Sequence, residues 1–335
     1  MNEVVVLTGG KTPEYNVSLI SAREVIKHFP KNYQPIPVII NKDNSCLSLV
    51  CKKHFLTITK DLAFDADQEL VFPQAIKINW PDLVKIGKMV FIAIHGPFGE
   101  DGKIQGLLDL LELPYTGSGP LASALGINKL FFRKIMIAEK ITIPKFVIYR
   151  SEENQEKIFN FLSLPLFVKP HNQGSSIGVS LVRKKSELEP ALRLAQQFSD
   201  TILVDEMIQG KEIACGVIGN QKPQALPIAE IVPQEDFFDY QAKYQPKGAK
   251  EIIPAKINQT TTRTVQKLAI RIHQVLGCRG FSRTDFIINQ NQKPVVLEIN
   301  TIPGLTSQSI LPKEAKTAGI SYTEMIDKII KLAEE

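Results

Sequence analysis

The chain has 335 residues, of which 44% are apolar and 22% are charged, and its formal net charge is +5. At roughly 150 residues per domain, this length predicts two or three domains of ordinary globular composition. No basic run is interleaved with aromatic residues, so the sequence does not favour nucleic acid as a partner. No segment reaches the ~18 uninterrupted apolar residues of a membrane span.

The cysteines and the first residues of the chain both favour the cytoplasm. Cys46, Cys51, Cys215 and Cys278 form neither a CxxC pair nor a cluster with histidine. This scatter argues against structural zinc and against a disulfide framework. The chain begins with a strand-like run and lacks the basic and apolar regions of a signal peptide. We therefore expect a cytoplasmic protein with no membrane partner.

Strand and helix patterns alternate in the first part of the chain. Strands are predicted at 3–8, 35–40 and 89–94, and helices at 16–29 and 103–113. Short apolar strands separated by amphipathic helices are typical of a parallel sheet that is covered on both faces. The stretch 41–85 is rich in lysine and is interrupted by Pro73 and Pro81. We expect it to be an irregular peripheral insertion.

The middle of the chain is predicted to form a small α+β unit with a glycine-rich loop. After the turn-rich stretch 115–123, a helix is expected at 129–140, strands at 145–149, 164–170 and 179–183, and a second helix through Ala195. Ser186 and Glu189 have the spacing of a capping box that would open this second helix.

Strands dominate from about residue 205 onward. They are expected at 202–206, 212–218, 229–232, 251–255, 281–288 and 294–300, with helices at 260–276 and from Ser321, where Glu324 completes a capping box. We therefore predict three domains, which are an N-terminal α/β domain at 1–118, a central unit at 119–204 and a C-terminal unit at 205–335.

A candidate metal site is formed by Asp285, Glu298 and Asn300. The strands around them flank the turn-like NQNQ, which predicts a hairpin. If the turn centres between Asn291 and Gln292, Asp285 lies directly opposite Glu298. Glu298 and Asn300 share a face because side chains alternate along a strand. Hard oxygen ligands of this kind suit magnesium bound to nucleotide phosphates, and the alternative is an ordinary surface hairpin with charges facing water.

Two further stretches have the residue types of a nucleotide site. Lys169 closes a strand before the loop 170–178, whose small residues let backbone N–H groups approach a phosphate. The alternative is a plain flexible hairpin. A strand end at 205–208 brings a carboxylate and main-chain groups together with Glu212, where an adenine edge and ribose hydroxyls would bind. Solvated charges at a domain junction are the alternative there.

Several long motifs follow one another along the chain. They are GGKTPEYNVSL, HGPFGEDGKIQGLLDLLELPYTGSG, NKLFFRK, VKPHNQGSSIGVS, FFDYQAKY, GFSRTDF and LEINTIPGLTSQS. In this order they resemble the D-alanine–D-alanine ligase family of ATP-grasp enzymes. The resemblance implies a three-domain fold of classes α/β and α+β. In this fold the N-terminal parallel α/β domain binds substrate, and two α+β subdomains sandwich ATP.

The resemblance also implies roles for the nucleotide and metal residues. Lys129 and Lys169 match contacts to ATP phosphates, Lys243 lies near the nucleotide, and Ser175 and Ser176 belong to the loop that closes over the phosphates. The positions that contact the rest of ATP are Asp205, Glu206, Met207, Ile208 and Glu212. Asp285, Glu298 and Asn300 match the ligands of two magnesium ions, with manganese as a substitute and Glu298 as the bridge.

The first substrate site is implied at Glu14, which matches the residue that holds the ammonium of the first D-alanine. Its network joins Ser175 and Tyr244, and His95 lies near the carboxylate of the same substrate. A tyrosine with a pKa near 10 stays neutral and would not repel the ammonium of a second D-alanine. Tyr244 is therefore expected to favour D-alanine over D-lactate as the acceptor.

The second substrate site and the oxyanion site are implied near the end of the chain. Arg283 and the backbone N–H of Gly304 would face the developing oxyanion, and Ser309 and Ile310 would receive the second carboxylate. Four positions depart from frequent residues of the family. They are Asn128 for Asp, Asp205 for Glu, Met207 for an aromatic residue and Ile310 for Leu. These changes bear on affinity and leave the reaction in place.

The function that the resemblance implies is the ATP-dependent joining of two D-alanines through an acyl phosphate, for peptidoglycan precursor synthesis. A ligase that makes the D-lactate ester is the nearest alternative. A nucleotide-binding regulatory protein is another, although the intact set of acids, lysines and arginine argues against it. Relatives are commonly homodimers, so a dimer is expected.

Overall fold

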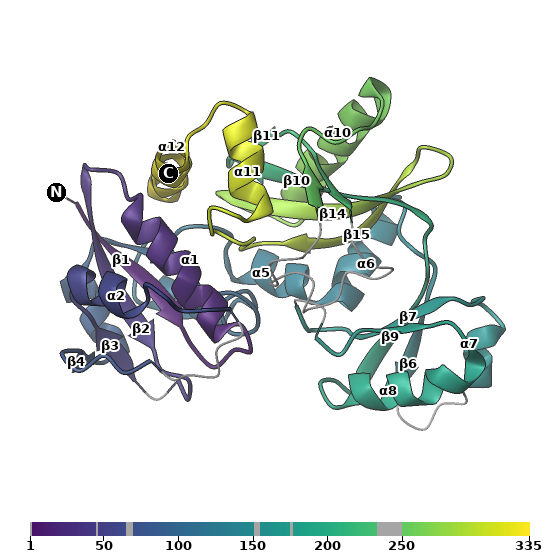
Figure 1. Ribbon diagram of the computed structural model, residues 1–335, viewed down its shortest axis with the longest axis horizontal. Coiled ribbons are helices and arrows are strands. Elements are labelled where there is room, and N and C mark those ends of the chain that lie inside the picture. Colours follow the sequence, from purple (N-terminus) through teal and green to yellow (C-terminus); the bar gives the residue numbers. More distant parts are fainter. Residues whose placement is uncertain (1, 45, 65–69, 151–154, 175–176, 233–249) are drawn as a thin grey trace.

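The computed structural model describes residues 2–44, 46–64, 70–150, 155–174, 177–232 and 250–335. The strands in these ranges form three sheets of five, six and four strands. Figure 1 shows the five-stranded sheet at one end of the molecule, the four-stranded sheet at the other and the six-stranded sheet between them. None of the helices in these ranges is long and apolar enough to cross a membrane.

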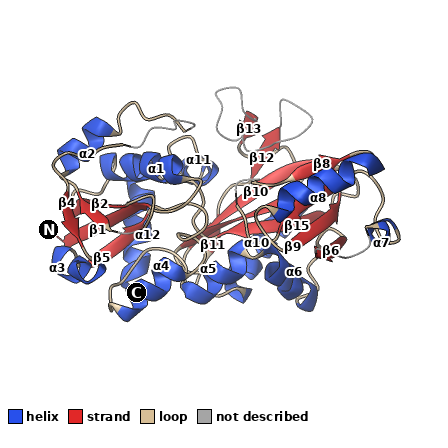
Figure 2. Cartoon of the chain, turned by 90° about the horizontal axis from the view of Figure 1, so that it is seen from below, coloured by secondary structure: helices blue, strands red, loops and turns tan. Residues whose placement is uncertain are grey.

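The N-terminal sheet has a parallel centre, as the sequence predicts. Its central elements are β1 (Asn2–Gly9), α1 (Tyr15–Lys27), β2 (Tyr33–Ile40), β5 (Met89–Ile92) and α4 (Lys103–Leu110). β1 pairs in parallel with β2 and with β5. Because side chains alternate along a strand, Val4 and Val6 pack with α1, whereas Val5 and Leu7 pack with α4. Figure 2 shows these two helices on opposite sides of the strands.

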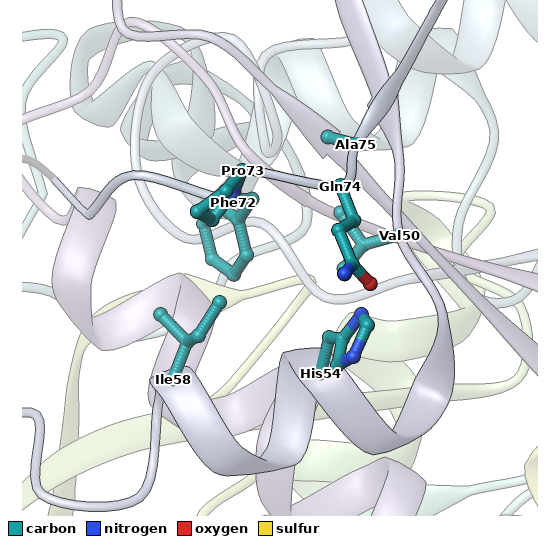
Figure 3. Close-up of a pocket in the computed structure, with 7 residues that line it drawn as sticks. All are labelled: Val50, His54, Ile58, Phe72, Pro73, Gln74 and Ala75. Carbon is teal, nitrogen blue, oxygen red and sulfur yellow. The ribbon is translucent and has the colours of Figure 1, made fainter.

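The stretch 41–85 is part of this sheet, so its prediction as an irregular peripheral insertion was wrong. It contains β3 (Leu47–Leu49), α2 (Lys52–Ile58), β4 (Ile76–Ile78), η1 (Trp80–Asp82) and α3 (Leu83–Ile86). β3 and β4 add antiparallel strands beside β2. Each has only three residues, too few for an alternating pattern to be recognised in the sequence. A cavity of about 220 Å³ lies between α2 and the segment before β4, and His54 and Gln74 face each other across it (Figure 3).

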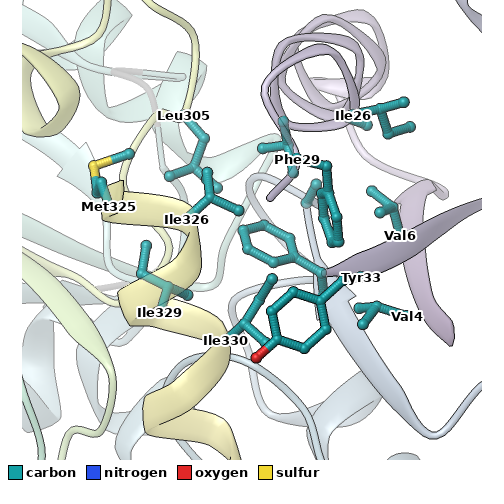
Figure 4. Packing of buried hydrophobic residues seen from close by; sticks show 14 of the residues in the cluster. Val4, Val6, Ile26, Phe29, Tyr33, Leu305, Met325, Ile326, Ile329 and Ile330 are labelled. Atoms are coloured by element: carbon teal, nitrogen blue, oxygen red, sulfur yellow. The ribbon is translucent and has the colours of Figure 1, made fainter. Parts of the chain in front are cut away.

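The last helix of the chain packs on the first domain. α12 (Tyr322–Glu334) begins with the predicted capping box, in which Glu324 accepts from the Ser321 N–H at 2.7 Å. Its apolar face packs against β1 and the end of α1, as Figure 4 shows for Ile326, Ile329 and Ile330. The chain ends are therefore joined through one core, and the predicted domain 205–335 shares its last helix with the N-terminal domain.

The six-stranded sheet is covered by different helices on its two faces. It consists of β10 (Gly210–Ile218), β11 (Gln224–Ala225), β12 (Ala229–Val232), β13 (Lys250–Ile252), β14 (Phe281–Asn289) and β15 (Pro294–Asn300). One face carries α5 (Pro120–Ile127), α6 (Lys129–Ala138) and α10 (Gln259–Val275). The helix α11 (Ile310–Thr317) lies on the other face, where Gly216 of β10 approaches Leu311.

The four-stranded sheet has the order β6-β9-β7-β8. Its elements are β6 (Phe146–Arg150), α7 (Glu156–Phe159), β7 (Leu166–Pro170), β8 (Ser180–Val182), η2 (Lys185–Glu187), α8 (Leu188–Gln196) and β9 (Thr201–Glu206). The predicted capping box at Ser186 and Glu189 was wrong, because Glu187 accepts from the N–H groups of Arg183 and Lys184, and α8 begins only at Leu188.

Parts of the predicted central unit at 119–204 pack or pair with neighbouring segments of the chain. The helices α5 and α6 pack in one core with β10 and β14, so they belong with the six-stranded sheet. The limit at 204/205 falls inside β9, which is hydrogen-bonded to β6 and β7 on either side. The stretch 115–123 was interpreted as a turn, but α5 begins inside it at Pro120. Proline is tolerated at the first helical position, because its missing N–H costs no hydrogen bond there.

Candidate active site

The predicted pairing of Asp285 with Glu298 is confirmed, although the turn is centred elsewhere. Asp285 lies opposite Glu298, and Arg283 lies opposite Asn300. Nearer the turn, Ile288 pairs with Pro294, which centres the hairpin on Asn291, one half-step from the predicted centre. An irregularity between Asp285 and Phe286 then shifts the register by one residue. A bulge of this kind is a common device for aiming a side chain next to a site.

Each candidate metal ligand contacts a charged or polar side chain at or beside the hairpin. Arg283 donates to both oxygens of Asp285, from Nε at 2.7 Å and from Nη2 at 2.8 Å, and Asn300 Nδ2 donates to Asp285 Oδ2 at 3.1 Å. Glu298 Oε2 lies 2.9 Å from Lys129 Nζ. Burial alone would lower the pKa of Arg283, but the carboxylate of Asp285 outweighs it and raises that pKa.

The donor set fits a hard divalent cation. Within the described ranges, no three side chains of His, Cys, Asp or Glu are grouped so that they could hold a metal ion. The candidate set is instead two carboxylates and one amide, which all offer oxygen and come from adjacent strands. Magnesium is usually held by one or two protein carboxylates together with substrate phosphates, so this set is sufficient for it.

Lys129 joins the hairpin to the glycine-rich loop. It occupies the first position of α6, and Asn128 caps that helix by accepting from the Phe131 N–H at 3.1 Å. Asn at this position therefore keeps the capping function that an Asp would have. The Lys129 backbone N–H donates to the His171 carbonyl at 2.7 Å, and its Nζ donates to the Gln173 carbonyl at 2.8 Å.

Lys169 and Asp205 are brought together in a buried charge cluster. Lys169 Nζ lies 2.6 Å from Asp205 Oδ2, and Arg133 donates to both oxygens of Asp205, with Nη2 at 2.6 Å from Oδ2. Asp205 is 2% exposed and Arg133 is fully buried. Burial favours the neutral form of Asp205, but Lys169 and Arg133 outweigh it and lower its pKa. Both carboxylate oxygens are thus engaged by cations, not directed to an open site.

Arg133 was missed by the sequence reasoning. The signal that could have found it is its spacing from Lys129, because residues four apart on a helix share one face. Burial lowers the pKa of Lys169, and the charge of Arg133 adds to this effect, whereas Asp205 opposes it. The neighbours of Lys169 in this cluster therefore control whether its ammonium stays protonated.

The other expected adenine-side residues lie at the end of β9 and the start of β10. Glu206 accepts from the Lys145 N–H at 2.8 Å. The Met207 N–H donates to the Pro165 carbonyl at 3.2 Å, and Ile208 is half-buried in the connection to β10. Glu212 is half-buried on β10, opposite Ile287 of β14.

Glu14 lies where the first domain meets the glycine-rich loop. It precedes α1, is 4% exposed, and its carbonyl accepts from both the N–H and the hydroxyl of Ser18 at 2.9 Å. A Cβ on Gly174 would be only 3.6 Å from Glu14 Oε2, and a Cβ on Gly96 only 2.5 Å from it. Gly96 has a positive φ of 78°, so a side chain there would be both strained and obstructive.

His95 is a buried histidine whose two ring nitrogens are both hydrogen-bonded. Nδ1 lies 3.1 Å from the Ile302 carbonyl, and Nε2 lies 2.7 Å from the Ser21 hydroxyl. A carbonyl can only accept, so Nδ1 carries the proton and Nε2 accepts from the hydroxyl. Burial lowers the pKa of His95 and keeps the ring neutral. The ring thereby joins β5, α1 and the segment after β15.

Glu100 is a second residue that the sequence reasoning missed. It lies in the HGPFGEDG run, which contributed to the resemblance without a role for this position. Glu100 Oε1 accepts from the Gly96 N–H at 2.8 Å and lies 4.0 Å from His95 Nδ1. Burial, reinforced by the charge of Glu14, raises the pKa of Glu100 to about 8. Near pH 7 it is therefore mostly a neutral acid.

Among the residues that the structure describes, no side chain caps the N–H groups at the start of α11. Ser309 is the N-cap residue but its hydroxyl makes no capping bond, since it lies 2.8 Å from the Thr306 hydroxyl and accepts from the Thr306 N–H. Ile310 begins the helix. Uncapped N–H groups at a helix start suit a carboxylate. A Cβ on Gly304 would lie 2.7 Å from Ser309 Oγ, so glycine keeps this segment close.

Four residues of the expected site, Ser175, Ser176, Lys243 and Tyr244, lie outside the described residues.

Solved structures that resemble this one along their whole length are ligases. The VanG D-Ala:D-Ser ligase from Enterococcus faecalis is 33% identical with a TM-score of 0.84, and the match covers 99% of each chain. The D-alanine–D-alanine ligase from Bacillus anthracis complexed with ATP is 27% identical with a TM-score of 0.77, covering 100% of this chain and 98% of that one. The expected ATP-grasp fold is confirmed by these likenesses.

Comparisons of sequence narrow this class to one family. The family model described as the D-ala D-ala ligase N-terminus matches residues 3–118, and that described as the D-ala D-ala ligase C-terminus matches residues 122–331. The D-alanine–D-alanine ligase of Pelotomaculum thermopropionicum is 37% identical, over 99% of this chain and 97% of its own length. That of Syntrophobacter fumaroxidans is 38% identical, over the same shares. This chain belongs to the D-alanine–D-alanine ligase family and is an ATP-dependent ligase.

Proposed function

We propose that this enzyme uses ATP to join two D-alanine molecules into D-alanyl-D-alanine for the synthesis of peptidoglycan precursors. The observation that carries the proposal is the convergence of Lys129, Arg283, Asp285 and Glu298 on one hairpin of an ATP-grasp fold. It is supported by the match of the whole chain to relatives named for this reaction.

The nucleotide lies, in this proposal, between the four-stranded and six-stranded sheets. Lys129 and Lys169, together with Lys243, offset the phosphate charge, and the strand end at 205–208 with Glu212 faces the rest of ATP. Asp285, Glu298 and Asn300 hold two magnesium ions, for which manganese can substitute. Bound there, the ions would polarise phosphate oxygens as Lewis acids. The opposed carboxylates of β14 and β15 support this assignment.

The reaction then takes two displacements. A carboxylate oxygen of the first D-alanine attacks the γ-phosphorus of ATP, the bond from that phosphorus to ADP breaks, and ADP leaves. The amine of the second D-alanine, after losing a proton, attacks the carbonyl carbon of the acyl phosphate. The tetrahedral centre collapses, the carbon–oxygen bond to phosphate breaks, and the dipeptide remains.

This chain's own residues orient those steps. Glu14 binds the ammonium of the first D-alanine through a charge-assisted hydrogen bond, and His95 lies beside its carboxylate. Arg283 and the Gly304 N–H donate to the oxyanion of the tetrahedral centre. The start of α11, at Ser309 and Ile310, receives the carboxylate of the second D-alanine. These assignments are supported by the burial of Glu14 and His95 and by the position of Arg283 on the metal hairpin.

The acyl phosphate would be hydrolysed if water reached it, so the site must close. We assign this role to the loop that contains Ser175 and Ser176 and to Tyr244. Support comes from Gly174, which approaches the carboxylate of Glu14, and from Gln173, which is held by Lys129. We further propose that the enzyme acts in the cytoplasm as a homodimer, which light scattering on the purified protein would test.

Product analysis tests the choice of acceptor. The likeness to a D-Ala:D-Ser ligase makes D-serine a necessary competitor beside D-lactate. Purified enzyme is given ATP, magnesium and D-alanine, with or without an equal concentration of D-serine or D-lactate at pH 7, and products are separated by mass. We expect D-alanyl-D-alanine to dominate in each mixture. A mixed product would reassign the acceptor, and the absence of ADP release with D-alanine would instead favour a regulatory protein.

A further inference from the structure

Glu314 is a buried acid that the proposed reaction does not use. It lies in the second turn of α11, is fully buried, and its Oε2 accepts from the Gly216 N–H at 3.0 Å. Among the described residues, its Oε1 has no hydrogen bond of ordinary geometry, although the Ala229 N–H also acts on the carboxyl group. Burying a carboxyl group without pairing all of its polar atoms is costly, so its presence calls for a reason beyond packing.

Glu314 packs on β10, the strand that pairs with the Arg283 strand β14. Gly216 of β10 lies directly opposite Arg283 of β14. Directly opposed residues of an antiparallel pair point to the same face, so Arg283 lies on the face that α11 covers. Burial raises the pKa of Glu314, and the positive charge of Arg283 opposes this effect, so the guanidinium lies close enough to act on the acid.

The close approach of α11 to β10 depends on glycine at position 216. A Cβ there would lie 2.5 Å from Glu314 Oε2 and 2.5 Å from Leu311 Cδ1. The carboxyl group of Glu314 thus occupies space that any other residue at 216 would fill. Glycine on the strand and the acid on the helix form a matched pair that sets the distance between the two elements.

The same helix begins at the proposed site of the second substrate. Glu314 follows Ser309 by about one and a half helical turns, about 7.5 Å along the axis at 1.5 Å per residue. The amine of the second D-alanine must reach a carbon whose oxyanion faces Arg283, and errors of about 1 Å in such alignments can cost 100-fold in rate. The hydrogen bond from Gly216 to Glu314 would limit this error, because it fixes α11 relative to β10 and β14.

We propose that Glu314 is a positioning residue that holds the first turn of α11, and with it the second-substrate site, at a fixed place relative to Arg283. This inference rests on the proposed function. Burial raises the pKa of Glu314 well above its ordinary value, which agrees with a neutral acid that accepts from Gly216 while it lies near a cation. A neutral glutamine should therefore replace it, whereas an apolar residue of similar size should not.

The test compares Glu314→Gln with Glu314→Leu. ADP release is followed over a range of D-alanine concentrations, so that the first-site and second-site KM values are resolved, and ATP is then varied separately. We expect the Leu variant to raise the second-site KM at least tenfold and to lower kcat, with the first-site and ATP KM values within twofold of wild type. The Gln variant should stay within twofold throughout. A folded Leu variant with all three KM values and kcat unchanged would overturn the proposal, as would equal changes in all three.

Glu230 provides the matched control. It is another buried acid, and it accepts from Lys211 Nζ at 2.9 Å and from the Lys256 N–H at 2.8 Å. Glu230 lies opposite Ile213, so its side chain is on the face of the sheet that α10 covers and not on the face that α11 covers. Glu230→Leu should lower the melting temperature without a selective change in the second-site KM. A selective change in this control would remove the evidence for a special role of Glu314.

Two further measurements keep the outcome decisive. If the Leu variant does not fold, Gly216→Ala leaves Glu314 in the chain but displaces its carboxyl group, and it should give the same selective rise in the second-site KM. Hydrogen exchange over residues 305–317 does not need turnover, and it should be faster in the Leu variant but not in the Gln variant. Wild type without ligase activity would refute the proposed function alone, whereas unchanged exchange in the Leu variant would refute the role of Glu314.

Discussion

Replacing Arg133 with methionine tests the buried charge cluster directly. Arg133 is fully buried, and methionine keeps most of its volume while it removes the guanidinium that binds both oxygens of Asp205. Breaking a buried ion pair by removing one partner typically costs about 3–5 kcal/mol, because the remaining charge is left in a medium of low polarity. Lys169 still lies 2.6 Å from Asp205 and offsets part of this loss.

We therefore expect a destabilisation near the lower end, about 3 kcal/mol. For a chain of this size class, that corresponds to a fall in Tm of about 6–12 °C. The pKa of Asp205 is lowered in the fold, so its ionised form contributes stability above its ordinary pKa, and this contribution disappears as the pH falls through the lowered value. The difference between wild type and variant should accordingly be full between pH 5 and 8 and shrink below pH 4.

Scanning calorimetry across this pH range measures the effect, and Arg193→Met is the matched control. Arg193 pairs with Glu189 on the surface, where their side chains are 76% and 53% exposed. An exposed pair contributes at most about 0.5 kcal/mol, so the control should shift Tm by no more than about 2 °C. The KM for ATP should also rise several-fold in Arg133→Met, since Lys169 then has to balance the charge of Asp205 without the guanidinium. Equal Tm shifts in the two variants would refute the reasoning.

Three further predictions concern the site itself. Arg283→Ala removes a proposed oxyanion donor, worth about 2.7–4 kcal/mol, and should lower kcat by two to three orders of magnitude with a smaller change in the KM for ATP; near-normal turnover would contradict the role. Glu14→Gln should raise the KM for the first D-alanine far more than that for ATP, measured by the same ADP-release assay, and equal effects would indicate a folding defect. Burial raises the pKa of Glu100 to about 8, so the folded protein loses stability as the pH rises from about 4.5 toward 8. The Tm of Glu100→Gln should therefore fall less steeply than that of wild type over this range. Parallel curves of Tm against pH would show that Glu100 does not titrate as described.

Much of the fold could be predicted because its main elements have strong patterns. The apolar runs of β1, β2 and β5 and the amphipathic pattern of α10 extend over enough residues to be recognised. The three-residue strands β3 and β4 do not, since their pairing is decided by β2 beside them. The start of α5 was obscured because glycine and proline at 117–120 indicate a turn equally well.

The pairing of Asp285 with Glu298 was predicted correctly, although the turn centre and the bulge in the hairpin were not. The prediction placed Asp285 opposite Glu298 from a symmetric turn, whereas the structure combines a turn centred on Asn291 with a register shift that restores the same pair. A bulge has no reliable mark in a single sequence, because it depends on how the two strands twist against their neighbours. The same limit applies to Arg133 and Glu100, whose importance arises from burial that only the assembled sheets create.

The cationic side chains of the site form ion pairs that must open when the nucleotide and the metal bind. Lys129 lies beside Glu298, Arg283 beside Asp285 and Lys169 beside Asp205, so each of these three proposed donors already has a carboxylate partner. Phosphates bound by the lysines would compete with these carboxylates, and divalent cations bound by Asp285 and Glu298 would release Arg283 and Lys129 in return. Neither exchange is favourable alone, since each would leave a partly buried charge without its partner. Nucleotide and metal should therefore bind more tightly together than separately, and calorimetric titration with ATP in the presence and absence of magnesium would measure that coupling. Equal affinities under the two conditions would show that the pairs at the hairpin do not open when the nucleotide binds.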